Sequence, residues 1–562
     1  MPDRGRRAIS IGGHIDSAGR GVSCISFRQD GRSAIQPLQE NWIPTKPARV
    51  TRDGIVVAQN AVAASVGAAV LAEGGNAADA AVATAFALGV VEPWMSGIGG
   101  AGFLLYGEAR TQQVRAVDFT TVAAAGLDPA RYALAGGTSP SLFGWPKVVE
   151  DRNLKGYESI GVPGAVDGLG LAVEAFGRKS LAELIAPAIR LAEEGLRIDW
   201  YAMLSIAIGA AELREFPASR ALYLPDGLPP VVAEGAAPRR LPMPALAATY
   251  RRIAEAGRRD FYEGELAGLL LADLEAGGSP LRAADLAGYR ARLIETPPNI
   301  DYRGVVFHHP SELTGGPTFA TALQEINRRL PAVPGAYPDE GEYVVYADAL
   351  RAAFEERFRS LGQGGMAAAA AAPDSCTTHI AVVDRDGNMA SLTNTLLSRF
   401  GSKVVLPRTG VLMNNGMMWF DPVPGRPNSI APGRRPLANV CPVLGTREGV
   451  PWVAMGASGG RRIISAMVQL ASFLVDFNMP LEKAFELPRL DASSETLTCS
   501  DRFPAEIVVA LRNSFEVEIV EETLYPSPFA VPSAVMCPRS TNMNTGMAHI
   551  HSPAAAAVAE GT

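Results

Sequence analysis

The sequence predicts an α+β fold in which helices flank a set of strands. Stretches with the helical spacing of apolar residues fill much of the chain before residue 361, and short β-branched runs lie between them. Residues 378–395 form two β-rich runs joined by Asp-Arg-Asp-Gly at 384–387. Asp-Gly between such runs is a strong hairpin signal, because glycine accepts the positive φ of a tight turn. This hairpin is expected at the centre of the fold.

The elements are expected in the following order. A strand at 54–59 precedes a helix at 61–73, which Gly74-Gly75 ends as a C-cap. Segment 79–91 is almost wholly apolar but too short to span a bilayer, which predicts a buried core helix. Further helices are predicted at 164–176, 180–194, 200–216, 242–256, 266–276, 318–330, 343–359 and 463–477, and short strands at 305–307, 403–406, 410–413 and 453–455. Residues 217–241 carry five prolines and predict a surface connection.

Composition excludes several classes of protein. The net charge of −7 is mild and forms no basic stripe, so neither nucleic acid nor an anionic membrane surface is an expected partner. The five cysteines are odd in number and scattered, which argues against a disulfide framework or a metal site and favours a reducing compartment. No stretch is a transmembrane candidate. Residues 1–46 are polar and without period, and predict a poorly ordered extension.

Two motifs invite a cofactor or metal interpretation, and neither supports one. Residues 97–102 match G-x-G-x-x-G, but a strand signal follows them and not the helix that a nucleotide-binding turn opens. These glycines predict close approach of main chains beneath a site. His308 and His309 are adjacent on a strand and point to opposite faces, while His549 and His551 are expected to be solvated. No cofactor and no metal is expected.

Thr377 follows a segment that is suited to cleavage. Six alanines at 367–372 form a poor core segment and a plausible accessible linker just before Cys376 and Thr377. A threonine hydroxyl is a weak nucleophile that needs a base. Cleavage between Cys376 and Thr377 frees an α-amine with a pKa of roughly 7.7–8, close to the value that a general base needs. One residue then supplies nucleophile and base, although β-propensity alone also explains a Thr-Thr pair at a strand start.

The run Cys-Thr-Thr-His at 376–379, with Val-Val-Asp at 382–384 and Asp-Gly-Asn at 386–388, resembles the start of the small subunit of γ-glutamyltransferases. That family belongs to the N-terminal nucleophile (Ntn) hydrolases. Further blocks similar to the family follow its order, at 73–81, 97–100, 162–164, 414–415, 435–437 and 458–460. The resemblance implies a four-layer αββα sandwich and a precursor that cuts itself before Thr377. A large subunit, 47–376, and a small subunit, 377–562, then form one intertwined heterodimer.

The resemblance also implies the catalytic residues. Thr377 matches the nucleophile and base, and Thr395 matches a second threonine that supports the nucleophile and autocleavage. Thr377 and Thr395 are expected to face each other across the hairpin. Gly459 and Gly460 match the pair whose N–H groups form an oxyanion hole, where no side chain obstructs the donors.

The substrate-recognition positions depart from the family. Thr120 replaces an arginine, Leu397 an asparagine, Gly416 and Trp419 a glutamine and an aspartate, and Ala438-Asn439 a serine pair. A clamp on an amino-acid head group depends on charge-assisted hydrogen bonds, so γ-glutamyl binding is expected to lose several kcal/mol. The loop between Phe420 and Arg435 is short, and the lid of some members is expected to be missing.

Arg399 and Arg461 are new charges relative to the family motifs. We hypothesise that Arg461 grips a distal carboxylate of the acyl group; a surface arginine with a solvated head is the alternative. The candidate substrate-binding residues are therefore Thr120, Arg399, Asn439 and Arg461.

The expected function is that of a self-processing amidohydrolase or acyltransferase. Thr377 attacks an acyl amide, γ-glutamyl or glutaryl-like, and water or an amine resolves the acyl-enzyme. One alternative is a cephalosporin or glutaryl acylase-type hydrolase without γ-glutamyl transfer, and another is an unprocessed, non-catalytic member. The expected partners are the small-molecule substrate and the chain's own fragments. Residues 1–20 lack the apolar stretch of a signal peptide, which predicts a cytoplasmic protein, whereas many family members are exported.

Overall fold

The computed structural model describes residues 46–139, 144–330, 335–362, 376–525, 527–538, 541 and 543–562. The predicted N-terminal extension, apart from residue 46, and the alanine-rich linker at 367–372 lie outside the described residues.

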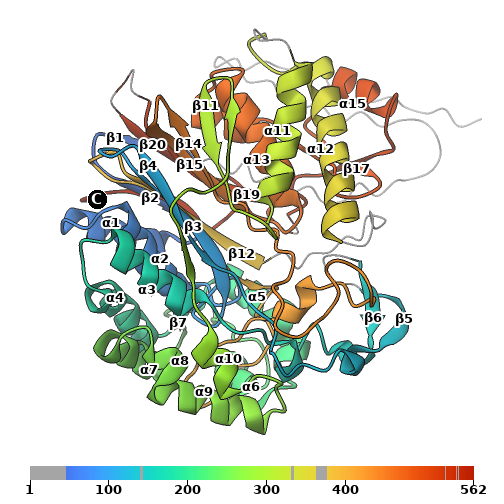
Figure 1. The fold of residues 1–562 in the computed structure, drawn as a ribbon. Coiled ribbons are helices and arrows are strands. Elements are labelled where there is room, and N and C mark those ends of the chain that lie inside the picture. Colours follow the sequence, from blue (N-terminus) through green and yellow to red (C-terminus); the bar gives the residue numbers. More distant parts are fainter. Residues whose placement is uncertain are drawn as a thin grey trace, which may run out of the picture. The chain divides into compact units, whose positions relative to one another are not determined.

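Two seven-stranded sheets form the centre of the described chain (Figure 1). Sheet I has the order β21 (Ala556–Ala559), β2 (Ile55–Ala58), β12 (Cys376–Val383), β13 (Met389–Leu397), β3 (Ala101–Glu108), β4 (Gln113–Phe119) and β9 (Arg292–Ile294). Sheet II has the order β1 (Arg49–Thr51), β20 (Asn544–Ala548), β19 (Val531–Met536), β15 (Val450–Ser458), β14 (Val443–Arg447), β11 (Val305–His308) and β10 (Asn299–Tyr302). All neighbouring pairs in both sheets are antiparallel.

Helices cover the outer face of each sheet. Sheet I packs against α1 (Ala61–Ala72), α2 (Ala77–Val91) and α3 (Ala165–Phe176), and sheet II against α11 (Gly316–Arg329) and α13 (Arg462–Val475), with α12 (Glu340–Leu361) on α11. The other helices are α4 (Leu181–Glu194), α5 (Trp200–Leu213), α6 (Pro217–Tyr223), α7 (Pro244–Ala256), α8 (Asp260–Glu263), α9 (Glu265–Ala276), α10 (Ala283–Gly288), α14 (Leu481–Glu486) and α15 (Ala505–Arg512). The smaller strands are β5 (Leu134–Thr138), β6 (Pro146–Val148), β7 (Leu196–Arg197), β8 (Arg240–Leu241), β16 (Leu490–Asp491), β17 (Leu497–Ser500) and β18 (Val517–Val520).

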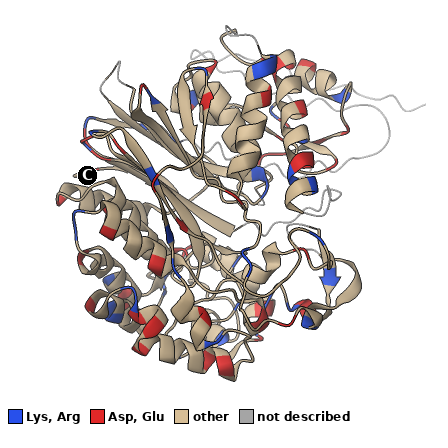
Figure 2. Ribbon diagram, in the orientation of Figure 1, with Lys and Arg blue, Asp and Glu red and all other residues tan. Residues whose placement is uncertain are grey.

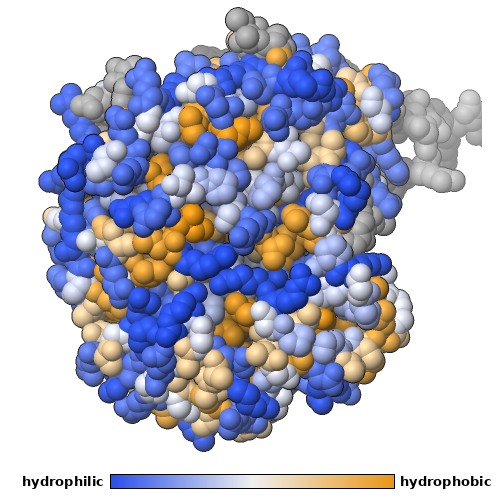
Figure 3. All heavy atoms as spheres, viewed as in Figure 1, coloured by the Kyte–Doolittle hydropathy of each residue, from blue (hydrophilic) through white to orange (hydrophobic). Residues whose placement is uncertain are grey.

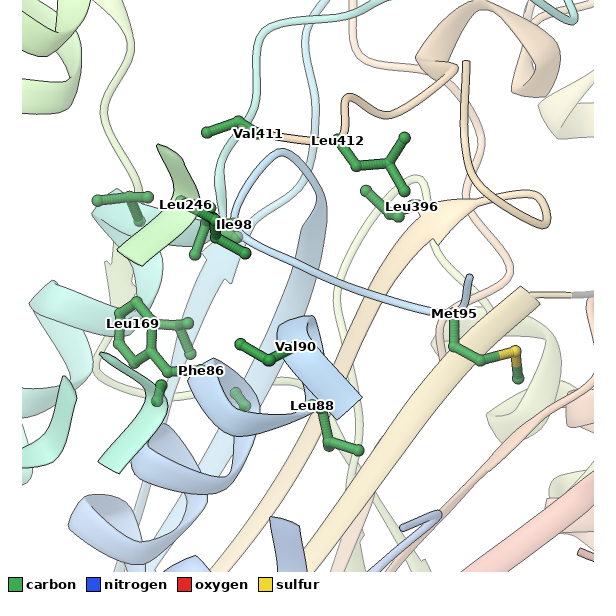
Figure 4. Close-up of a cluster of buried hydrophobic side chains, with 14 of the residues drawn as sticks. Phe86, Leu88, Val90, Met95, Ile98, Leu169, Leu246, Leu396, Val411 and Leu412 are labelled. Atoms are coloured by element: carbon green, nitrogen blue, oxygen red, sulfur yellow. The ribbon is translucent and has the colours of Figure 1, made fainter. Parts of the chain in front are cut away.

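The four layers enclose three apolar cores, as the alternation of side chains along a strand requires. On β12, Ile380 and Val382 face the core beneath α1–α3, whereas Ala381 and Val383 face the core between the sheets. Figure 4 shows part of the first core, in which side chains from α2, from the loop that follows α2 (Met95 and Ile98) and from β13 (Leu396) gather. A third core lies between sheet II and its helices. The predicted four-layer αββα sandwich is confirmed.

The hairpin of β12 and β13 is anchored at its turn. Gly387 has φ +82°, as the Asp-Gly signal predicts. The Asp384 carboxylate accepts the N–H of Asn388 at 2.9 Å and that of Ala77, the first residue of α2, at 3.0 Å. The buried helix α2 and the hairpin of β12 and β13 are therefore fixed to each other.

Some local predictions are wrong. The proline-rich segment 217–241 contains α6 and β8 and is not only a connection. Segments 403–406 and 410–413 form no strands and share only an isolated bridge between Val405 and Leu412. Lys403 and Gly410 have φ of +67° and +68°, which interrupts an extended conformation.

Charged residues are spread over the helices and connections, and the central strands carry few of them (Figure 2). On the face in Figure 3, hydrophobic residues form separate patches among hydrophilic ones. Within the described part of the chain, none of the helices combines the length and apolar character needed to cross a membrane.

Candidate active site

Thr377 lies in an irregularity of the central strand pair. Cys376 pairs with Leu397 and Thr378 with Asn394, so the register shifts by one residue at Thr377. Two residues of β13, Thr395 and Leu396, lie opposite the single residue Thr377, so the extra residue of this bulge is on β13, where it re-aims the side chains relative to a regular strand. Thr377 is buried, with 4% of its surface exposed. The regular pairing of β12 with β13 is therefore interrupted where Thr377 faces Thr395.

The hydroxyls of Thr377 and Thr395 meet at one carbonyl. Thr377 Oγ1 and Thr395 Oγ1 each lie 2.6 Å from the main-chain oxygen of Cys376, and 3.3 Å from each other. The N–H of Leu397 donates to Thr395 Oγ1 at 2.8 Å, which leaves the Thr395 proton for the carbonyl. The prediction that Thr377 and Thr395 face each other is confirmed. The arrangement places two hydroxyl groups at the Cys376–Thr377 peptide, both within hydrogen-bond distance of its oxygen.

The glycines at 97–102 allow the main chains beneath this pair to approach closely. A Cβ on Gly100 would lie 2.4 Å from the oxygen of Thr395, and one on Gly102 would lie 2.0 Å from the oxygen of Thr393. The strand β3 begins directly at Ala101. The interpretation of the G-x-G-x-x-G match as a close-packing motif is confirmed.

Gly459 and Gly460 form the turn from β15 to α13. Their φ values are +149° and +62°, which side-chain-bearing residues rarely adopt. A Cβ on Gly459 would lie 2.7 Å from the Cα of Ala530. Their N–H groups lie at the amino end of a helix, where the helix dipole favours negative charge. Main-chain N–H groups at such a helix start are of the kind that can bind an oxyanion.

Arg461 is buried and not solvated. It is the N-cap of α13, is 6% exposed, and its guanidinium carbon lies 4.9 Å from the ring centroid of Phe358. Burial lowers the pKa of Arg461 to about 10, so the side chain stays cationic at neutral pH. The surface alternative for Arg461 is wrong. Arg399 is also buried, and its charge opposes the rise that burial causes in the pKa of Glu92.

Arg357 lies near Arg461 and was not predicted. It donates to the Asn439 side-chain oxygen at 2.9 Å and to the Ala438 carbonyl at 2.7 Å. Burial and the charge of Arg461 lower the pKa of Arg357 to about 9. The sequence gives one indication that Arg357 is buried, its place in α12 beside the buried residues Phe354 and Phe358. Arg357 fixes Asn439, a predicted substrate-binding residue.

The side chain of Thr120 is hydrogen-bonded to the neighbouring carboxylate of Asp118. Its hydroxyl donates to Asp118 at 2.7 Å, and Arg435 donates to its carbonyl at 2.9 Å. Burial raises the pKa of Asp118, but the charge of Arg435 and hydrogen bonds from Thr120 and Arg292 leave it below its usual value. Thr120 thus belongs to an ion-paired network at the end of β4.

Three of the positions that depart from the family gather in one apolar cluster. Leu397, Trp419 and Ala438 all belong to the core between the sheets. The nearby Asn414 is structural: its amide nitrogen donates to the carbonyls of Gly99 and Gly161 at 2.7 and 3.0 Å. Positions that would hold a charged head group in the family are therefore packed with apolar side chains.

The imidazole of His379 is buried and hydrogen-bonded to Thr393. Its Nδ1 lies 3.0 Å from Thr393 Oγ1, and a Cβ on Gly456 would lie 2.3 Å from that nitrogen. Burial lowers the pKa of His379 to about 3, so the ring is neutral at physiological pH. Among the described residues, no group of three or more His, Cys, Asp or Glu side chains is placed to hold a metal ion.

The predicted solvation of His549 is wrong. The side chain is 2% exposed, and its Nε2 lies 2.8 Å from Arg489 Nη2.

Comparison with known proteins identifies the family. The model of the family described as gamma-glutamyltranspeptidase matches residues 63–370 and 362–540. The glutathione hydrolase proenzyme of Pseudomonas sp. strain A14 is 32% identical over 481 residues, which cover 78% of this chain and 81% of that protein. The acylase ACY 1 proenzyme of Pseudomonas sp. strain SE83 is 32% identical over 506 residues, which cover 83% and 87%.

Among solved structures, the cephalosporin acylase from Bacillus halodurans has a TM-score of 0.77 and 24% identity, and covers 93% of this chain and 99% of that chain. This similarity shows the fold. The class is thus that of Ntn hydrolases. The chain belongs to the γ-glutamyltranspeptidase family, and it is an enzyme, as its hydrolase and acylase relatives are.

Proposed function

We propose that the protein is a self-processing amidohydrolase whose nucleophile is Thr377. The observation that carries the proposal is the shared hydrogen-bond acceptor of Thr377 and Thr395, the carbonyl of Cys376. The proenzyme relatives support it, since a precursor must be cut before it can act.

In the first stage the chain acts on itself. Thr377 Oγ1 attacks the Cys376 carbonyl carbon, the peptide C–N bond breaks, and the acyl group moves from nitrogen to oxygen. Thr395 stabilises the negative charge that develops on the carbonyl oxygen. Water then hydrolyses the ester, which leaves a carboxylate on Cys376 and a free α-amine on Thr377. That amine has the pKa of roughly 7.7–8 that suits a general base.

In the second stage Thr377 attacks the substrate amide. The α-amine takes the hydroxyl proton, the oxyanion is held by the N–H groups of Gly459 and Gly460, and the leaving amine departs with a proton. Water, or a second amine, resolves the ester on Thr377. The heterodimer of residues up to Cys376 and from Thr377 onward is the active form.

The acyl group that fits the site best is a dicarboxylic monoacyl group without an α-amine, such as glutaryl. The apolar cluster of Leu397, Trp419 and Ala438 offers no charge to an amino-acid head group. Arg461, at the start of α13, supplies positive charge for a distal carboxylate. Arg357 of α12 is close enough to Arg461 for the two charges to interact, and it adds to the positive charge there. The glutathione hydrolase relative and the acylase relative are both 32% identical to this chain, so γ-glutamyl donors are included in the substrate test.

The test combines intact mass with a substrate screen. The wild-type protein should give two fragments, the second starting at Thr377, while Thr377→Ala should stay one chain. The cut enzyme is then offered glutaryl, γ-glutamyl and butyryl p-nitroanilides, and kcat/KM should be highest for glutaryl. A higher value for γ-glutamyl would overturn the substrate assignment, and an uncut, inactive wild-type chain would identify an unprocessed family member.

A further inference from the structure

A short segment of the chain packs directly against the oxyanion turn. Residues 527–530, here called the buttress segment, lead into β19, which pairs with β15 up to Ser458 opposite Val531. The position of a Cβ on Gly459 is 2.7 Å from both Cα and Cβ of Ala530, so Gly459 touches the segment with no space between them.

Arg462, the first residue of α13, joins the buttress segment to the oxyanion turn. Its Nη1 donates to the carbonyls of Ser527 at 3.2 Å and Pro528 at 2.7 Å. Its Nε donates to the carbonyl of Gly459 itself at 3.3 Å. A guanidinium is a rigid planar fork, so these three acceptors are held at fixed relative positions.

Arg489 holds the other end of the segment. Its Nη2 donates to the carbonyl of Ala530 at 3.2 Å and lies 2.8 Å from Nε2 of His549. Arg489 is 3% exposed, and burial lowers its pKa to about 10, so a cation is retained in the interior. Burying a guanidinium costs free energy unless its N–H groups are hydrogen-bonded. The guanidinium of Arg489 donates to the carbonyl of Ala530, the residue that contacts Gly459.

We propose that Arg462 and Arg489 are positioning residues for the oxyanion hole, acting through the buttress segment on Gly459. The inference rests on the proposed function, because it requires the Gly459 N–H to bind the oxyanion. The donor must point at the place where charge develops, and a displacement of about 1 Å can cost on the order of 10²-fold in rate. Autocleavage depends instead on Thr377 and Thr395 and does not need this contact.

The test compares Arg462→Gln and Arg489→Gln with Arg351→Gln. Arg351 is a matched control, because it also donates to two main-chain carbonyls, those of Ser494 and Glu495, which belong neither to the buttress segment nor to the oxyanion turn. Intact mass, melting temperature, kcat and KM for the best anilide, and the inhibition constant of the matching alkyl boronic acid are measured. The boronate forms a tetrahedral adduct on Thr377 and places an oxygen in the oxyanion hole.

We expect both variants to cut themselves normally and to keep KM within about twofold, while kcat falls by about 10- to 100-fold. The boronate inhibition constant should rise in parallel with the loss in kcat, and Arg351→Gln should change neither. Unchanged kcat in cut, folded Arg462→Gln and Arg489→Gln would overturn the inference and leave the proposed function intact. A wild-type chain that is neither cut nor active would instead overturn the proposed function and, with it, the inference.

If neither arginine variant folds, the inference is tested with Ala530→Gly. That change removes the Cβ that touches Gly459 and leaves both arginines in place. It should lower kcat at constant KM, and an unchanged kcat would overturn the inference.

Discussion

Thr377 and Thr395 lie on adjacent strands with their hydroxyl oxygens 3.3 Å apart, and both hydroxyls reach the same acceptor, the carbonyl of Cys376. One hydroxyl belongs to the residue that follows the Cys376–Thr377 bond, and the other lies within hydrogen-bond distance of the carbonyl of that bond. This geometry would serve the proposed self-cleavage before any substrate binds.

Thr377→Ala should abolish both cleavage and turnover, because the nucleophile is lost. Thr378→Val is the matched control: Thr378 is the neighbouring threonine, and within the described part of the chain its hydroxyl has no hydrogen-bond partner. Intact mass after purification measures cleavage. Cleavage of Thr377→Ala at this bond, or its failure in a folded Thr378→Val, would contradict the assignment.

Thr395→Val should slow cleavage by about 10²–10³-fold, the usual cost of removing one donor to a developing oxyanion. Thr395→Ser should restore most of the rate, because it keeps the hydroxyl that reaches Cys376. The rate is followed by mass over time after rapid purification. Equal rates for the valine and serine variants would show that the hydroxyl is not needed.

Arg461→Gln should raise KM for glutaryl anilide by tenfold or more, which corresponds to about 1.4 kcal/mol, and should leave KM for butyryl anilide nearly unchanged. The difference arises because only the glutaryl group has a distal carboxylate. Arg447→Gln is the control, because Arg447 stacks on Trp452 at 3.8 Å and is outside the proposed site. Parallel changes for both anilides would mean that Arg461 has only a structural role.

Gly100→Ala should destabilise the protein by about 1–3 kcal/mol and slow cleavage, because its Cβ would lie 2.4 Å from the Thr395 carbonyl and displace that strand. Gly126→Ala is the control, since no atom lies within 4 Å of the corresponding Cβ. Denaturant unfolding and cleavage rate measure the two effects. A Gly100→Ala chain as stable as Gly126→Ala would contradict the close approach.

The value of kcat/KM should rise with pH and level off above about 8, because the free α-amine of Thr377 must be neutral to act as a base. His379 should add nothing to this profile, since burial lowers its pKa to about 3. The pH profile of kcat/KM for a His379→Asn enzyme should therefore show the same apparent pKa as the wild type. A shifted apparent pKa would mean that His379, and not the α-amine, causes the rise with pH.

His379 should also make the stability of the folded protein depend on pH in the acid range. Between pH 6.5 and about 3, the unfolded chain binds a proton at His379 that the folded chain does not bind. Stability should therefore fall as pH falls through this window, by up to about 1.4 kcal/mol per pH unit for this group. Unfolding in urea across that range, with His379→Asn for comparison, measures it.

The elements that sequence predicts well are those that local chemistry determines. Residues close in sequence determine three of them: the Asp-Gly turn, the apolar helix α2 and the glycines before β3. Thr377 and Thr395 could be paired because a hairpin brings them opposite each other.

The residues that sequence missed act across long separations. Arg357, Arg462 and Arg489 donate largely to main-chain carbonyls of distant segments, and a carbonyl acceptor leaves no motif. His549 was expected in solvent because its burial depends on Arg489, 60 residues away. The two absent strands fail for a local reason, the positive φ of Lys403 in one segment and of Gly410 in the other.

The order of strands has a consequence for the cut protein. In sheet I, β12 and β13 from the part after Thr377 lie between β2 and β3 from the part before it, and in sheet II four strands of the later part lie between β1 and β11. Hydrolysis of one peptide bond would thus leave two polypeptides that cannot part without breaking both sheets. Dilution should not dissociate them. The assembled state would be reached only through the uncut chain, so fragments that are separated in denaturant and mixed again are not expected to regain it.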